Sequence, residues 1–314
     1  MKLIVSMGIR PDSNSPLRAR LVEIDVDQRR VCRSLTLPFQ AEWHSGPRAD
    51  DEATRPAWID GALIQPTHTA VHCVDVEHWV VSETHSSPDL HNIHSVWPDG
   101  DRWLLTAAGR DAVVWLDRQG NTEVRALAAA RERVASQSVD HRILHHGHYK
   151  PHDFHPNCAW THEGQIWVTC FERRAALEVG GARQIAFDQI PHDGSPQEGL
   201  WWFTLVDGRV VAHDPTTLER VHALDLRAMF GAPGLLGWCR GVHVAGDRLF
   251  VGFTQLRATR HRRVLRWLAS AGRDRQLPTR VVEVDLRRGC LVGEIPIAPG
   301  GTIYGISPAR APSG

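Results

Sequence analysis

A short hairpin with an aspartate at its turn recurs along this chain, and it constrains the fold more than any other feature. Each copy is a strand-like apolar run that ends in Asp and leads into a second strand-like run. Aspartate suits the turn because its carboxylate accepts hydrogen bonds from nearby backbone N–H groups. Ala175–Val179 is a further copy that lacks the aspartate. The complete copies have their turns at Asp25, Asp75, Asp117, Asp214 and Asp285.

Two further strands precede each hairpin in the pattern. One is an apolar strand that ends in a small hydroxyl residue, as in Trp103–Thr106 and Ile166–Thr169. Before it lies a segment that carries histidine in several copies. Four antiparallel strands in a repeat of about 40 residues or more are typical of one β-propeller blade.

Six such units predict an all-β fold, a six-bladed β-propeller in which residues 1–314 form a single domain. The first blade is split, because its later strands begin at Leu3 whereas its inner strand is expected at Gly301–Ile306. The C-terminal strand would then join the N-terminal blade and remove an open sheet edge. The second blade is the weakest copy, with its inner strand expected near Pro56–Ile59. An alternative register would place His72 on an inner strand instead.

Helical patterns are scarce in this sequence. Ala126–Val134 and His261–Ala271 are the two candidates, and both read as excursions between strands. Since helices do not alternate with the predicted strands, a parallel α/β fold is disfavoured.

Composition excludes several classes of function. Lys plus Arg and Asp plus Glu are balanced at 36 each, so charge gives no reason to expect a nucleic-acid partner. No apolar run reaches the length of a membrane span, and the N-terminal run is too short for a signal peptide. The six cysteines show no CxxC spacing. We therefore expect a cytoplasmic protein with reduced thiols that acts on a small molecule, without a membrane or nucleic-acid partner.

Histidine, with 19 copies, is the second repeated feature. The spacing His-x-x-His occurs at His91–His94 and again at His152–His155, and partial copies follow later in the chain. Because the inner strand of each blade lines the central channel, equivalent positions should converge on the axis. The first predicted layer comprises His94, His155 and His243. The second layer, three residues earlier and nearer the channel mouth, comprises His91, His152, His192 and Arg240.

Convergent neutral imidazoles are ligands that a divalent metal of borderline softness prefers. We therefore expect a metal site at His94, His155 and His243, with His91 as a further candidate ligand. Zinc suits such a set best, although Fe, Cu or Mn is compatible with it. Residues three apart in a regular strand face opposite sides, so both histidines of a pair reach the channel only if the entry loop is irregular. The alternative is a site one layer nearer the mouth.

Other residues near the inner strands are candidates for catalysis. The chain has two tyrosines, Tyr149 and Tyr304, and a phenol near a metal can act as a general base or stabilise an oxyanion. Arg240 is expected to anchor a carboxylate or sulfate. His152 and His192 are further catalytic candidates. Asp153 and Asp193 directly follow these two histidines and are expected to orient imidazoles.

The predicted architecture resembles the six-bladed β-propellers of the NHL and SMP-30 kind over the whole chain. The histidine set is also similar to that of the peptidyl-hydroxyglycine amidating lyases, which hold a zinc with one histidine from each of three inner strands. This resemblance implies that His94, His155 and His243 are ligands, with Tyr304 or Tyr149 and Arg240 as helpers. The chain shows neither the secretory signal nor the disulfide pattern of that family, so its substrate should differ.

The sequence thus predicts a metal-dependent enzyme of lyase, hydrolase or isomerase type that acts on a small polar molecule in the axial channel. The alternative is a non-catalytic propeller that binds a protein or a small ligand. Stoichiometric metal in the purified protein would distinguish the first from the second.

Overall fold

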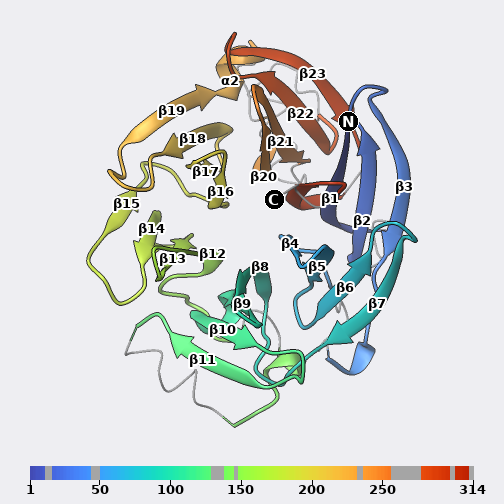
Figure 1. The fold of residues 1–314 in the computed structure, drawn as a ribbon, viewed down its shortest axis with the longest axis vertical. Coiled ribbons are helices and arrows are strands. Elements are labelled where there is room, and N and C mark those ends of the chain that lie inside the picture. Colours follow the sequence, from blue (N-terminus) through green and yellow to red (C-terminus); the bar gives the residue numbers. More distant parts are fainter. Residues whose placement is uncertain are drawn as a thin grey trace, which may run out of the picture.

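Six four-stranded antiparallel sheets are arranged radially around a common axis (Figure 1). The computed structural model describes residues 1–10, 16–43, 50–128, 138–144, 148–231, 236–255, 277–297 and 301–310. The predicted all-β, six-bladed propeller is therefore confirmed. Within the described ranges, no helix is both long and apolar enough to cross a membrane.

The first three blades, each given from the axis outward, contain the following strands. Blade 1 consists of β24 (Thr302–Pro308), β1 (Lys2–Ile9), β2 (Arg18–Asp25) and β3 (Arg30–Thr36). Blade 2 consists of β4 (Ala57–Ile59), β5 (Ala62–Pro66), β6 (Val71–Asp75) and β7 (Val80–His85). Blade 3 consists of β8 (Ile93–Asp99), β9 (Arg102–Ala107), β10 (Ala112–Leu116) and β11 (Thr122–Ala126).

The remaining blades follow in chain order. Blade 4 consists of β12 (Pro156–His162), β13 (Gln165–Cys170), β14 (Ala175–Glu178) and β15 (Gln184–Ala186). Blade 5 consists of β16 (Ser195–Gln197), β17 (Leu200–Thr204), β18 (Arg209–His213) and β19 (Arg220–Asp225). Blade 6 consists of β20 (Trp238–Ala245), β21 (Arg248–Thr254), β22 (Arg280–Asp285) and β23 (Cys290–Pro296).

The two ends of the chain meet in blade 1, as predicted. Strand β24 runs antiparallel to β1, with Pro308 opposite Leu3 and Thr302 opposite Gly8. The indole Nε1 of Trp58 in blade 2 donates to the Pro308 carbonyl at 3.0 Å, which ties the closing strand to the next blade. The closure pairs an edge of β1 that would otherwise be open.

The aspartate turns form as the sequence indicates. Asp117 Oδ1, for example, accepts from the backbone N–H groups of Gln119 at 2.9 Å and Asn121 at 2.8 Å. Turns of the same kind form at Asp25, Asp75, Asp214 and Asp285. In blade 4 the corresponding position holds Glu178, whose carboxylate binds the guanidinium of Arg183. The hairpin register also settles blade 2, because His72 lies on β6 and not on an inner strand.

Tryptophan fills the space between blades. Trp167 of blade 4 and Trp201 of blade 5 pack with their ring centroids 4.8 Å apart, and both are buried. Such rings bury large apolar areas and pack well at an angle to one another. The described helices are single turns: η1 (Ala41–Trp43), η2 (Ala108–Arg110), η4 (His141–Ile143) and α2 (Leu226–Met229). Of the predicted helices, 261–271 and most of 126–134 lie outside the described residues.

Candidate functional site

Side chains from all six blades meet near the propeller axis, and we call this group the axial cluster. His94 on β8 is its centre, since its ring centroid lies 5.2 Å from that of His155 and 6.3 Å from that of His192. The His94 ring also lies 5.9 Å from the ring of Tyr304. The full axial cluster is Glu52, His68, His94, His152, His155, His192, Arg240 and Tyr304.

An extra residue in several inner strands explains how these side chains are directed towards the propeller axis. At such a β-bulge two residues face one on the partner strand, which bends the strand and redirects side chains. The irregularity lies at the same level in several blades: between Ile93 and Val96, between Pro156 and Cys158, between Arg240 and Val242, and opposite Ser6–Met7. His94 and Tyr304 lie within these bulges, and His155 and Arg240 border them. A strand of regular pleat would not bring these four side chains together.

Buried hydroxyls of the second strands support these bulges. Thr106 Oγ1 lies 3.0 Å from Ser95 Oγ, beside His94. Thr204 donates to the Asp193 carboxylate, which also accepts from the Gly241 N–H at 2.8 Å. The hydroxyl that ends these strands in sequence therefore has a structural role at the axis.

The loop that carries His152 and His155 is held by one buried carboxylate. Asp111 accepts hydrogen bonds from the N–H groups of Asp153 at 2.8 Å and His155 at 2.7 Å, and from that of Phe154 at 3.3 Å. His155 has a positive φ of 48°, so the backbone here is irregular. This geometry places the His152 and His155 rings 5.1 Å apart, which a regular strand would prevent.

Loss of the Asp111 carboxylate should disorganise this loop. Asp111→Ala is expected to lower the free energy of unfolding by about 3 kcal/mol, because charge-assisted hydrogen bonds contribute roughly 1.5–3 kcal/mol each and buried N–H groups would lose their acceptor. Asp111→Asn keeps an acceptor oxygen and tolerates the φ of 52° at this position, so it should recover part of the loss. Urea unfolding checks this, and unchanged midpoints in both variants would contradict the role of Asp111.

Burial keeps the histidines of the axial cluster neutral. It lowers the pKa of His155 to about 3 and that of His192 to about 4, and the pKa of His94 lies well below its usual value for the same reason. The positive charge of Arg240 lowers all three further. In the described part of the chain, His94 Nδ1 and both ring nitrogens of His192 are buried without a hydrogen bond. Neutral imidazoles with uncommitted nitrogens are suited to coordinate a metal or to accept a proton.

These shifts predict that stability falls in mild acid. His72, His155, His192 and His243 all have folded pKa values of about 3 to 4, lowered mainly by burial from an ordinary value of 6.5. The unfolded chain therefore binds more protons than the folded protein from about pH 6.5 down to about pH 4. Each such histidine should cost up to about 1.4 kcal/mol of unfolding free energy per pH unit in this window. Asp51 opposes them, because burial raises its pKa to about 6.

Urea unfolding at pH 7.5 and pH 5 measures this effect. We expect a lower midpoint at pH 5 and a smaller difference between the two pH values in His192→Gln. Equal or greater stability at pH 5 would show that these histidines are not buried in the neutral form.

Tyr304 and Glu52 form a buried hydrogen-bonded pair beside the histidines. The Tyr304 hydroxyl donates to Glu52 Oε2, and His68 Nε2 lies 3.6 Å from the same oxygen. Burial raises the pKa of Tyr304, and the charge of Glu52 raises it further, so the phenol keeps its proton. Gly8 permits the arrangement, because a Cβ at that position would lie 2.6 Å from Glu52 Cγ. The phenol is thus a hydrogen-bond donor or acid here, rather than the base considered from sequence.

Arg240 brings a positive charge to the same place. Its guanidinium carbon lies 4.8 Å from the Tyr304 ring centroid and 4.5 Å from that of Trp238. Stacking between two rings fixes the plane of the guanidinium. Its Nε is buried without a hydrogen bond among the described residues. The group is therefore positioned to bind an anion.

Three predicted site residues, His91, Tyr149 and His243, lie outside the axial cluster. His243 Nδ1 donates to the Gln197 side-chain oxygen at 3.0 Å, and its ring stacks on Phe250. The extra residue in β20 is Gly241, with a φ of 77°, so Arg240 rather than His243 reaches the axial cluster. His91 turns to the Leu144 carbonyl at 3.2 Å, and Tyr149 hydrogen-bonds with His141 at 3.0 Å.

Sequence reasoning missed Glu52 and His68 and the supporting Asp111. Glu52 precedes β4 in a polar loop, and His68 lies in the β5–β6 connection, so neither belongs to the repeated histidine pattern. Of the two predicted orienting aspartates, Asp193 Oδ1 lies 3.9 Å from His192 Nδ1. Asp153 instead contributes its backbone N–H to Asp111.

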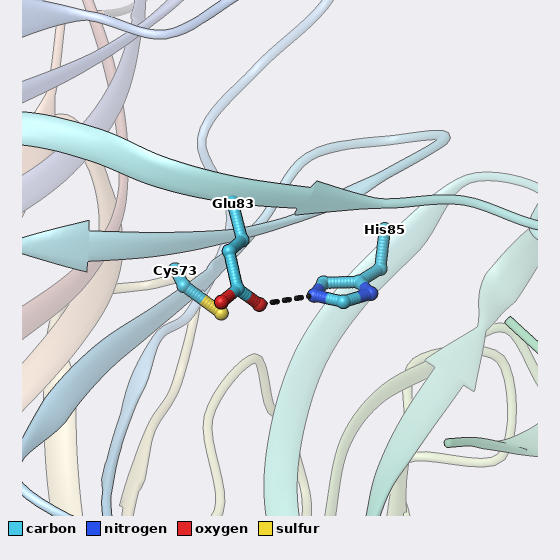
Figure 2. A group of neighbouring side chains, drawn as sticks. All are labelled: Cys73, Glu83 and His85. Atoms are coloured by element: carbon cyan, nitrogen blue, oxygen red, sulfur yellow. Dashed lines mark hydrogen bonds and ion pairs between the residues drawn. The ribbon is translucent and has the colours of Figure 1, made fainter. Parts of the chain in front are cut away.

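A second group of potential metal ligands lies away from the axial cluster. Among the described residues, Cys73, Glu83 and His85 are the only three whose ligand atoms all lie within 4.8 Å of one another (Figure 2). The nitrogens of the axial histidines are spaced more widely than this. Their rings would have to turn to share one ion.

Comparison with solved structures shows that other proteins share this fold. A protein of unknown function from Bacteroides caccae is 11% identical, with 97% of each chain covered and a TM-score of 0.59. A chain of the nidogen/laminin complex is 11% identical, with 98% of this chain and 97% of that chain covered and a TM-score of 0.59. A streptogramin B lyase is 9% identical, with 95% and 88% covered and a TM-score of 0.50. No family model and no curated protein matches the chain.

Proposed function

We propose that the axial cluster is the active site of a metal-dependent enzyme of lyase, hydrolase or isomerase type, acting on a small polar molecule that carries an anionic group. The observation that carries this proposal is the meeting of neutral imidazoles, a hydrogen-bonded Tyr304–Glu52 pair and an Arg240 guanidinium in one buried place. Each group comes from a different blade, and a core that served stability alone would not need them.

The metal would be held by His94, His155 and His192, which replace the set predicted from sequence. Their fit rests on neutral rings and on the uncommitted nitrogens of His94 and His192. Zinc is the best match for an all-imidazole set, although iron, copper or manganese is compatible with it. When bound, such a metal supplies polarisation of a carbonyl or hydroxyl oxygen.

The remaining residues have separate roles in this proposal. Arg240 binds the anionic group of the substrate, and its stacking on Tyr304 sets the orientation. Tyr304 donates a hydrogen bond to the reacting oxygen, while the Glu52 carboxylate accepts a proton that the substrate releases and His68 lies 3.6 Å from that carboxylate. The fold is compatible with lyase chemistry, since a streptogramin B lyase shares it. It is equally compatible with binding, since a chain of the nidogen/laminin complex shares it too.

Calorimetric titration of the untagged Cys73→Ser protein, which lacks the thiol of the second group of potential ligands, with zinc and then with sulfate, phosphate and acetate tests this proposal. We expect zinc binding at the axial cluster and binding of at least one of these anions. Arg240→Gln should weaken anion binding about tenfold or more, because a charge-assisted hydrogen bond contributes roughly 1.5–3 kcal/mol, and should leave zinc bound. A non-catalytic propeller would bind neither zinc at the axis nor a small anion through Arg240, and that result would overturn the proposal.

A further inference from the structure

Three side chains of different chemistry meet on one face of the two outer strands of blade 2. Cys73 on β6 lies directly opposite Glu83 on β7, and Val71 lies opposite His85. Since every second residue of a strand shares a face, Cys73, Glu83 and His85 project to the same side. Figure 2 shows the Glu83 carboxylate between the Cys73 thiol and the His85 imidazole.

We propose that Cys73, Glu83 and His85 form a zinc-binding site, independent of the axial cluster, in which water completes the coordination. Their ligand atoms already lie within 4.8 Å of one another, so a single ion reaches all three with small side-chain movements. Thiolate, imidazole and carboxylate are the three protein ligand types of zinc, and three protein ligands leave one tetrahedral position open. The thiolate favours zinc over magnesium or calcium, which prefer oxygen ligands.

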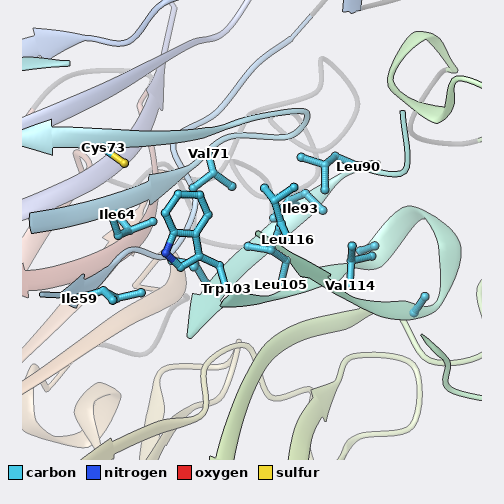
Figure 3. Close-up of a cluster of buried hydrophobic side chains, with 13 residues drawn as sticks. Ile59, Ile64, Val71, Cys73, Leu90, Ile93, Trp103, Leu105, Val114 and Leu116 are labelled. Carbon is cyan, nitrogen blue, oxygen red and sulfur yellow. The ribbon is translucent and has the colours of Figure 1, made fainter. Parts of the chain in front are cut away.

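The surroundings hold two of the ligands in place. Cys73 is 5% exposed and belongs to a buried apolar cluster that also includes Val71 and Trp103 (Figure 3). The His85 imidazole lies edge-on to the Trp103 indole of blade 3, with centroids 5.0 Å apart. His85 Nε2 is 3.0 Å from Glu83 Oε2, so the ring is already turned towards the proposed ion. Zinc binding would therefore restrict the side chains of Cys73 and His85 little further.

An ion would enter the site from solvent past the third ligand, Glu83. The Glu83 side chain is 57% exposed, whereas that of His85 is 14% exposed. The site therefore opens to solvent on the carboxylate side, where water can enter as the fourth ligand. An ion there would link β6 to β7 beside the contact with blade 3.

Cobalt(II) is the probe that tests this site, because a thiolate bound to cobalt gives a charge-transfer absorption that histidine ligands do not produce. We expect this band on titration of the untagged, reduced protein, and its stoichiometric loss when zinc is added. Cys73→Ser should abolish the band. Glu83→Gln and His85→Gln should weaken cobalt binding at least about tenfold, because loss of a group that merely orients a ligand already costs roughly that much.

Two control variants change a histidine of the same hairpin and a cysteine of another blade. His78→Gln changes an exposed histidine of blade 2 that hydrogen-bonds Asp75 at 2.7 Å, and it should leave the band unchanged. Cys290→Ser removes an exposed thiol and should also leave it unchanged. If Cys73→Ser fails to fold, the cobalt affinity of Glu83→Gln still tests the site, because Glu83 is exposed and its replacement should not disturb folding. No thiolate band in the native protein, a band that survives Cys73→Ser, or an unchanged cobalt affinity in Glu83→Gln would overturn the proposal.

Discussion

Replacement of His155 by alanine is expected to lower the zinc affinity of the axial cluster at least about 100-fold while the propeller stays folded. Loss of a group that merely orients a ligand costs roughly 10- to 100-fold in affinity, so loss of a ligand should cost at least as much. The inter-blade cores lie elsewhere, in apolar clusters such as that of Trp167 and Trp201. His94→Ala and His192→Ala should behave alike. The triple variant should be little worse than the worst single variant, because the three act as one site.

This titration is best made in a Cys73→Ser background, so that the site on blade 2 does not contribute. His78→Ala is the control, since that histidine is exposed on the β6–β7 turn. His243→Ala is a second control and should retain zinc, because His243 is bound to Gln197 outside the axial cluster. If His155→Ala binds zinc as tightly as the parent protein, His155 is not a ligand.

Deletion of residues 300–314 should prevent folding to a soluble monomer. It removes β24, which completes blade 1, and with it the buried side chains of Ile303 and Tyr304. Loss of one buried large apolar side chain costs roughly 2–5 kcal/mol, and folded domains are stable by only about 5–15 kcal/mol. The deletion would also expose the edge of β1 to association with other chains.

A circular permutant separates closure from simple loss of chain. Pro308 lies opposite Leu3, so residues 300–310 joined through a short linker to Met1 would form a hairpin with β1. This variant should fold, with a thermal midpoint close to that of the parent. A fully stable truncated chain would contradict the closure, as would a permutant that aggregates like the truncation.

The fold could be predicted because its signals are local. An aspartate such as Asp117 binds the N–H groups of its own turn, so the hairpin can be recognised without knowledge of the neighbouring blades. Counting hairpins then gives the number of blades. The closure of the propeller could also be predicted. The strand at Leu3 has no inner strand before it in sequence, and the strand at Thr302 has no hairpin after it, so the two complete one blade.

The axial cluster was only partly predictable, because it depends on register. One extra residue at Gly241 brings Arg240 to the axis and turns His243 away, and no periodicity in the sequence shows that extra residue. Glu52 and His68 come from connections that differ between blades. The histidine repeat nevertheless predicted that His94, His155 and His192 would lie near the channel.

The proposed zinc site on blade 2 depends on pairing across strands. Cys73 and Glu83 are ten residues apart in sequence and become neighbours only when β6 and β7 pair in the observed register. A search for closely spaced cysteines does not find such a set. An acidic residue and a histidine two positions apart, opposite a cysteine in a hairpin, would have been the useful signal.

Anomalous diffraction from crystals grown with zinc tests the central claim most directly, because it locates the ion. The proposed function predicts a peak at bonding distance, about 2.0–2.1 Å, from ring nitrogens of His94, His155 and His192. A peak between Cys73, Glu83 and His85 would report the second site and leave the axial claim untouched. Crystals of the zinc-saturated protein that show no peak within reach of these three imidazoles would contradict a metal-dependent active site on the propeller axis.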